Sequence, residues 1–132
     1  MSVTQSFVLC FIATLLALGS AVVTGFKARR RWHVASVISA VVMLAATIYF
    51  ALGLGELYDL ESAGVITPIH LTLAKITTAL YLLPIAAGVR TIYAPASRKL
   101  HRRLAYVALS MTVVTAITGT LMILMSTPRE PL

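Results

Sequence analysis

The sequence predicts an all-α integral membrane protein, folded as a four-helix bundle that crosses the bilayer four times. Of its 132 residues, 59% are hydrophobic and 11% are charged, which is too apolar for a soluble domain. Four apolar runs each approach the roughly 20 residues that a spanning helix needs. The runs are continuous rather than alternating, which excludes a β-barrel. We therefore predict one transmembrane domain over residues 1–132, with an up-down-up-down topology.

The first two predicted spans are Phe7–Phe26 and Val34–Leu54. The segment before Phe7 contains no lysine or arginine, whereas the basic cluster Lys27–Arg31 follows the first span. A secretory signal peptide has the reverse order, with its positive charge ahead of the apolar core. We expect the first span to be retained, with the N-terminus outside. The short loop makes these two spans antiparallel neighbours.

The third span is predicted over Ile69–Val89, after an acidic loop. The loop Gly53–Pro68 holds three of the four acidic residues and no lysine or arginine. Thr67-Pro68 is a helix-start signal, because proline is favoured at the first helical position. Pro84 lies within the span and is expected to kink it, since proline lacks a backbone N–H.

The fourth span, Leu104–Met125, follows a second basic cluster at Arg98–Arg103. Lysine and arginine are retained on the cytoplasmic side of a membrane, so the two clusters predict that both termini lie outside. The same placement accounts for the net charge of +7 without a nucleic-acid partner. We expect a multi-pass protein of the plasma or inner membrane, with the lipid bilayer as its first partner.

Small residues form one face of the fourth span. Positions three and four apart share a helical face, and below His101 that face reads Ala105, Ala108, Thr112, Thr115, Gly119. Such a groove admits either another helix or a flat ligand. The pattern H-x-x-L-A-x13-G occurs twice, from His70 to Gly88 and from His101 to Gly119.

Three histidines and one lysine, His33, His70, His101 and Lys75, are the residues suited to chemistry in or beside the spans. The spans contain no carboxylate, which argues against a proton-coupled transporter, and no catalytic residue is predicted. The topology places His33 and His101 on one side and His70 on the other. Three ligands therefore cannot converge on zinc, but two imidazoles can ligate one haem iron. Without a C-x-x-C-H motif the haem is of b-type.

Basic residues beside His101 suit the haem propionates, because guanidinium pairs well with carboxylate. These residues are Lys99, Arg102 and Arg103, and Ala105 would leave room for the macrocycle. Lys75 lies more than one turn below His70. It either extends its ammonium group to the outer water or contacts a substrate.

The stretch from Ile69 to Leu124 resembles the core of cytochrome b561-type membrane haem proteins. It is also similar to small bacterial membrane proteins with an H…HR-x-x-G pattern. The resemblance implies that histidines on alternate helices pair around haem, His33 with His101, and that His70 belongs to a second, opposite site. The chain departs from that family in having three histidines rather than four and four spans rather than six. It has alanine where the family has glycine, four residues after the histidine.

The leading hypothesis is a b-type haem protein that passes electrons between a quinol or small reductant and an acceptor. A second hypothesis is a non-catalytic membrane subunit or assembly partner of a larger complex or homo-oligomer. Its small-residue faces would then be contact surfaces. A third is a small-molecule or lipid-binding protein, with Lys75 and His70 facing an outward pocket.

Overall fold

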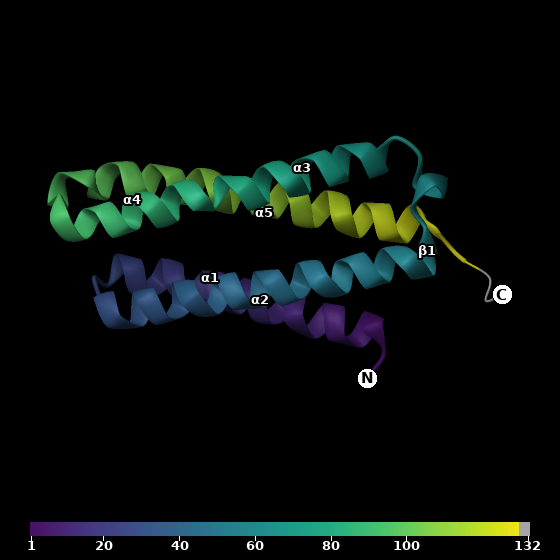
Figure 1. Ribbon diagram of the computed structural model, residues 1–132, viewed down its shortest axis with the longest axis horizontal. Helices are drawn as coiled ribbons and strands as arrows, with labels where there is room; N and C mark the ends of the chain where they lie inside the picture. The colour runs from purple at the N-terminus through teal and green to yellow at the C-terminus, as the bar shows by residue number, and fades with distance from the viewer. Residues whose placement is uncertain (130–132) are drawn as a thin grey trace. The chain divides into compact units, whose positions relative to one another are not determined.

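The computed structural model describes residues 1–129 and forms two compact units, Met1–Tyr58 with Arg129, and Asp59–Pro128. The first unit is an antiparallel hairpin of α1 (Val3–Phe26) and α2 (Arg30–Leu57), as Figure 1 shows. This hairpin corresponds to the first two predicted spans. The single four-helix bundle predicted from the sequence stays a prediction, and each unit is described by itself.

Local signals in the sequence set both ends of α1. The Ser2 hydroxyl accepts a hydrogen bond from the Gln5 backbone, and the Gln5 side chain accepts one from the Ser2 backbone. This reciprocal capping box satisfies two N–H groups that the helix cannot pair internally. At the other end the chain reverses through Ala28, which has φ of 52°. A left-handed residue at this point allows the short turn into α2.

The second unit contains α3 (Ile66–Leu80), α4 (Leu82–Tyr93) and α5 (Arg98–Met125). Together α3 and α4 form one apolar stretch, Ile66–Tyr93, interrupted at a turn at Tyr81. Pro84 has no N–H to donate to the carbonyl of residue 80, four positions earlier, so the helix is weakened there. The helix is interrupted at Tyr81, about one turn before the proline, and the kink expected at Pro84 stays a prediction.

Short elements connect the helices outside the spans. They are β1 (Tyr58–Asp59), η1 (Leu60–Ala63), η2 (Pro95–Ser97) and β2 (Thr127–Pro128), and the two strands pair with each other. In the second unit the Ser62 hydroxyl accepts the Thr127 backbone N–H at 2.9 Å. Gly64, at φ of 67°, ends η1. These bonds hold the outer loop and the end of α5 together.

Both units bury small side chains and expose large apolar ones. Ala108 is 1% exposed, whereas Leu124 on the same helix is 76% exposed. Among residues 1–129 no large side chain is fully buried. Helices in a membrane pack through small residues because lipid solvates large apolar side chains. The buried residues within the helices include Thr14, Ala21, Ala40, Thr47, Thr77, Ala87 and Ala108.

Threonine hydroxyls also join the helices of each unit. Thr14 and Thr47 are 3.0 Å apart between α1 and α2, and Thr77 and Thr115 are 2.9 Å apart between α3 and α5. Hydrogen bonds between membrane helices contribute about 0.6 kcal/mol each. They fix the register of each helix pair more than they add to its stability.

Four helical stretches are long and apolar enough to cross a membrane, so the chain has the composition of a multi-pass membrane protein. The helices extend further than the predicted spans, because the basic clusters are themselves helical. Arg30 starts α2 and Arg98 starts α5. His33 and His101 are therefore each the fourth residue of a helix, one turn inside it, rather than at its opening.

The predicted orientation is testable with single cysteines on a Cys10→Ser background. Glu61→Cys lies in the exposed outer loop, and Ala96→Cys lies in the exposed turn before α5. We expect a membrane-impermeant maleimide to label Glu61→Cys in intact cells and Ala96→Cys only after permeabilisation, because the basic clusters stay inside. The reverse pattern would place the N-terminus inside.

Candidate functional site

His101 is held against α4 by a backbone carbonyl and a glycine. Its Nδ1 lies 2.8 Å from the carbonyl oxygen of Pro84. A carbonyl can only accept, so Nδ1 carries the hydrogen and donates it. One turn further along α4, a Cβ added to Gly88 would lie 3.1 Å from His101 Cε1. A side chain at position 88 would therefore require the imidazole to shift.

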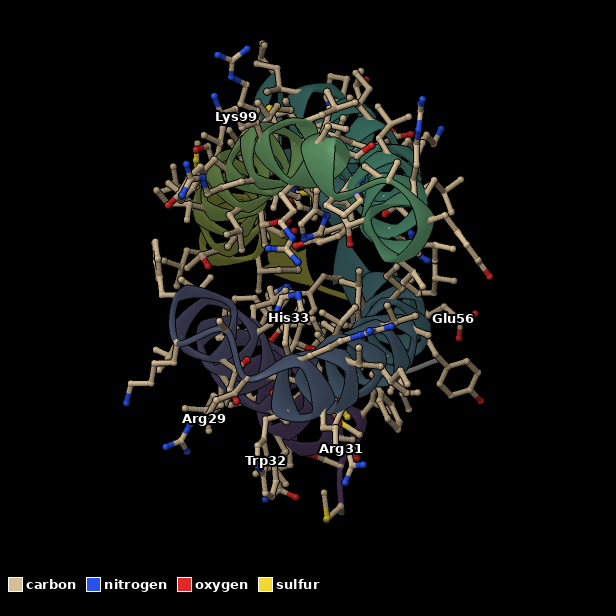
Figure 2. All side chains as sticks on the ribbon, turned by 90° about the vertical axis from the view of Figure 1, so that its left-hand side faces the viewer. Arg29, Arg31, Trp32, His33, Glu56 and Lys99 are labelled. Atoms are coloured by element: carbon tan, nitrogen blue, oxygen red, sulfur yellow. The ribbon has the colours of Figure 1, made fainter. Side chains whose placement is uncertain are left out.

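His33 has the same surroundings in the first unit. Its Nδ1 donates to the carbonyl oxygen of Ala21 at 2.8 Å. A Cβ on Gly25, one turn after Ala21, would lie 3.2 Å from His33 Nδ1. Figure 2 shows Arg31 and Trp32 pointing away from this hairpin, on the side opposite His33. The histidine thus faces α1, while its neighbours in sequence are exposed.

His70 packs on α5 in a similar way. Its Nδ1 is 3.2 Å from the Thr118 hydroxyl, and its ring also hydrogen-bonds the backbone of Thr115. The Thr118 hydroxyl donates to the carbonyls of Val114 and Thr115, each at 3.0 Å. Because the Thr118 hydroxyl uses its one hydrogen in these bonds, its oxygen accepts the hydrogen bond from His70 Nδ1. A Cβ on Gly119 would come within 2.6 Å of His70 Cε1.

The repeated spacing from histidine to glycine has a structural explanation. His70 and Gly88 lie 18 residues apart, as do His101 and Gly119, which is about 27 Å along a helix. Each histidine and its glycine therefore lie at opposite ends of a span. Because the two spans are antiparallel, His101 packs on Gly88 and His70 packs on Gly119. The pattern encodes two reciprocal histidine–glycine contacts.

The small-residue face of α5 is the seam with α3 and α4. The Thr112 hydroxyl hydrogen-bonds the Tyr81 hydroxyl at 2.5 Å, and the Thr115 hydroxyl bonds Thr77. Ala108 is buried between these contacts and His101. Of the two occupants that the sequence allowed for this groove, a helix or a flat ligand, the structure has the helix. Ala105 is half-buried beside this seam.

The basic residues predicted to surround a cofactor lie on the surface. Lys99, Arg102 and Arg103 are exposed in the first two turns of α5, and Figure 2 shows Lys99 pointing away from its unit. Lys75 is also exposed. It lies five residues after His70, which places the two side chains about 140° apart around α3. These two residues therefore do not share one helical face.

For His33 and His101 the hydrogen bond to a carbonyl determines the tautomer of the ring. In a neutral imidazole that donates from Nδ1, the lone pair is on Nε2. Histidines that ligate metals almost always donate their other N–H to a carbonyl, carboxylate or water. His33 and His101 meet this condition through Ala21 and Pro84, so both fit an axial ligand of haem iron. Within residues 1–129 no cluster of three or more His, Cys, Asp or Glu could hold a bare metal ion.

No family model, curated protein or solved structure matches the chain. The likeness to cytochrome b561-type proteins therefore stays a prediction from the histidine, alanine and glycine positions.

Several residues that position the histidines were not predicted from the sequence. They are Gly25 and the backbone carbonyls of Ala21 and Pro84. The available signal was the glycine near the end of each helix that precedes a histidine-bearing helix. Gly25 lies eight residues before His33, and Gly88 lies thirteen before His101. Every residue has a backbone carbonyl, so the sequence does not show which carbonyls accept these hydrogen bonds.

Proposed function

We propose that the protein is a b-type haem-binding membrane protein that transfers electrons, with His33 and His101 as the axial ligands. The observation that carries the proposal is the Nδ1–H···O=C bond made by each histidine, at 2.8 Å in both units. This bond sets the tautomer and orientation of the ring and increases the basicity of Nε2. Haem would supply one-electron redox chemistry.

Chain direction supports this choice of histidines. Each is the fourth residue of the second helix in its hairpin. In a chain whose four spans alternate in direction, these two positions share one side of the membrane. His70 is the fifth residue of α3 and belongs to the other side. A pair of neutral imidazoles from one side is the ligand set of a six-coordinate haem.

The basic residues around His101 would then bind the propionates. Lys99, Arg102 and Arg103 are exposed one residue or two away from His101, where their side chains can reach an anionic group at the membrane surface. Charge-assisted bonds from guanidinium to carboxylate are among the stronger protein hydrogen bonds. The electron donor in this proposal is a quinol or another small reductant.

An absorption spectrum of protein purified from haem-replete cells tests the proposal. We expect a Soret band that shifts to longer wavelength and sharpens on reduction with dithionite, and that is absent from protein made without haem. A colourless protein that also binds no added haemin in detergent would exclude this function. That outcome would favour a subunit of a larger membrane complex.

A further inference from the structure

The two units share a set of interactions at matching positions. Each unit is a helical hairpin, made of α1 and α2 in the first unit and of the α3–α4 stretch and α5 in the second. In the first arm of each hairpin, Thr14, Ala21 and Gly25 correspond to Thr77, Pro84 and Gly88, always 63 residues later. In the second helix, His33, Ala40 and Thr47 correspond to His101, Ala108 and Thr115, always 68 residues later. The five-residue difference lies between the glycine and the histidine: α4 continues five residues past Gly88, whereas α1 continues one past Gly25, and the turn that follows is one residue longer in the second hairpin.

The matching residues make the same contacts. The Thr14–Thr47 bond corresponds to Thr77–Thr115. The bond from His33 to the Ala21 carbonyl corresponds to that from His101 to the Pro84 carbonyl. Each glycine also faces the ring of its histidine, because a Cβ added to Gly25 or Gly88 would lie 3.2 Å or 3.1 Å from the nearest ring atom. Buried Ala40 and Leu54 correspond to buried Ala108 and Met122.

Basic residues next to the histidines are repeated as well. Arg30 and Arg31 precede His33 as Arg98 and Lys99 precede His101, again 68 residues apart. A helical hairpin in a membrane needs none of these contacts in order to form, because any small-residue seam would serve. Their joint recurrence at fixed spacings therefore points to a common structural unit.

The surroundings of His70 at the outer end are not repeated in the first hairpin. The position that matches His70 is Phe7, and the position that matches Gly119 is Ala51. Thr118, which accepts from His70, corresponds to Phe50. The second hairpin thus has an imidazole packed on a glycine at its outer end, and the first hairpin has apolar side chains at the three matching positions.

We infer that the chain is a tandem repeat of one helical hairpin, in which a carbonyl and a glycine of the first helix position the histidine of the second. His33 and His101 therefore hold equivalent positions, one in each hairpin, and under the proposed function each would supply one ligand. Gly25 and Gly88 are positioning residues, since a side chain at either would displace the ring that Nδ1 holds. This inference rests on the proposed function and specifies its ligands and stoichiometry.

Matched glycine substitutions test the inference in the full-length protein. We expect Gly25→Val and Gly88→Val each to lower haem affinity at least tenfold, and by amounts that agree within a factor of about two, since second-shell changes at metal sites cost 10- to 100-fold. Each should also allow carbon monoxide to bind the reduced haem, because the displaced histidine leaves a coordination position open. Gly19→Val is the control, because a Cβ at Gly19 has nothing within 4 Å.

A second measurement does not need haem. In haem-free protein, nitrogen NMR of the histidine rings should show the Nδ1–H tautomer for His33 and His101, and lose it for one ring in each glycine variant. If Gly25→Val or Gly88→Val fails to fold, the milder Gly→Ala variants give the same comparison. Haem content of the wild type should be one per chain, unchanged by His70→Ala.

The outcomes separate this inference from the proposed function. If the wild type binds haem but one glycine variant behaves like Gly19→Val, the equivalence of the hairpins is wrong. If two haems bind per chain, His33 and His101 do not ligate the same haem and the stoichiometry is wrong. A third outcome is that no haem binds, but both rings show the Nδ1–H tautomer and each loses it in its own glycine variant. In that case the tandem repeat is supported and the proposed haem function is wrong.

Discussion

His33→Ala and His101→Ala should each abolish the low-spin haem spectrum, while His70→Ala leaves it unchanged. Loss of either ligand leaves an iron with one protein imidazole. Because outer-shell changes alone lower metal affinity by about 10- to 100-fold, loss of the ligand itself should lower haem affinity by about 100-fold or more. The measurement is a haemin titration in detergent, followed at the Soret band, for the three variants and the wild type.

His70→Ala is a close control for these two substitutions. All three histidines are half-buried, and each packs on a glycine of a neighbouring helix. A general loss of folding after removal of an imidazole would therefore affect the three variants alike. If His70→Ala lost the band while His101→Ala kept it, the site would lie at the other end of the spans. Equal haemin titration curves for the wild type and all three variants would show that none of these histidines ligates haem.

Ala108→Leu should destabilise the second hairpin more than any other single apolar exchange on α5. Ala108 is 1% exposed in the seam with α3 and α4, so three added carbon atoms have no space. Overpacking of this kind costs about 1–3 kcal/mol. The measurement is the free energy of unfolding in mixed detergent micelles, by loss of helical circular dichroism.

Val113→Leu is the matched control on the same helix. Val113 is 58% exposed, and its added methylene would enter lipid or detergent at little cost. In the first hairpin, Ala40→Leu should behave like Ala108→Leu, because Ala40 is 5% exposed at the matching position. If Ala108→Leu and Val113→Leu unfold alike, Ala108 does not lie in a packed seam.

Sequence alone was sufficient to predict the four helical stretches of membrane-spanning length. Runs of about 20 apolar residues are unmistakable, because the thickness of the hydrocarbon core sets their length. The four runs correspond to the four helical stretches of the structure, and Pro84 marked the interruption between α3 and α4. The predicted spans began several residues after the actual helix starts at Arg30 and Arg98. Hydropathy identifies only the apolar part of a helix, and the first turns of α2 and α5 are charged.

The tertiary structure alone decided what each histidine touches. Helical periodicity identified the small face below His101, but it did not determine whether a helix or a ligand fills that face. Register across an antiparallel pair depends on where the chain reverses, and the two hairpins differ by five residues in the separation of the glycine and the histidine. Because of this difference, no single spacing in the sequence aligns both arms of the two hairpins, and the correspondence of Gly25 with Gly88 is apparent only in the structure. The acceptors of the Nδ1 hydrogens are main-chain carbonyls, which every residue possesses, so only the packing of the helices selects Ala21 and Pro84.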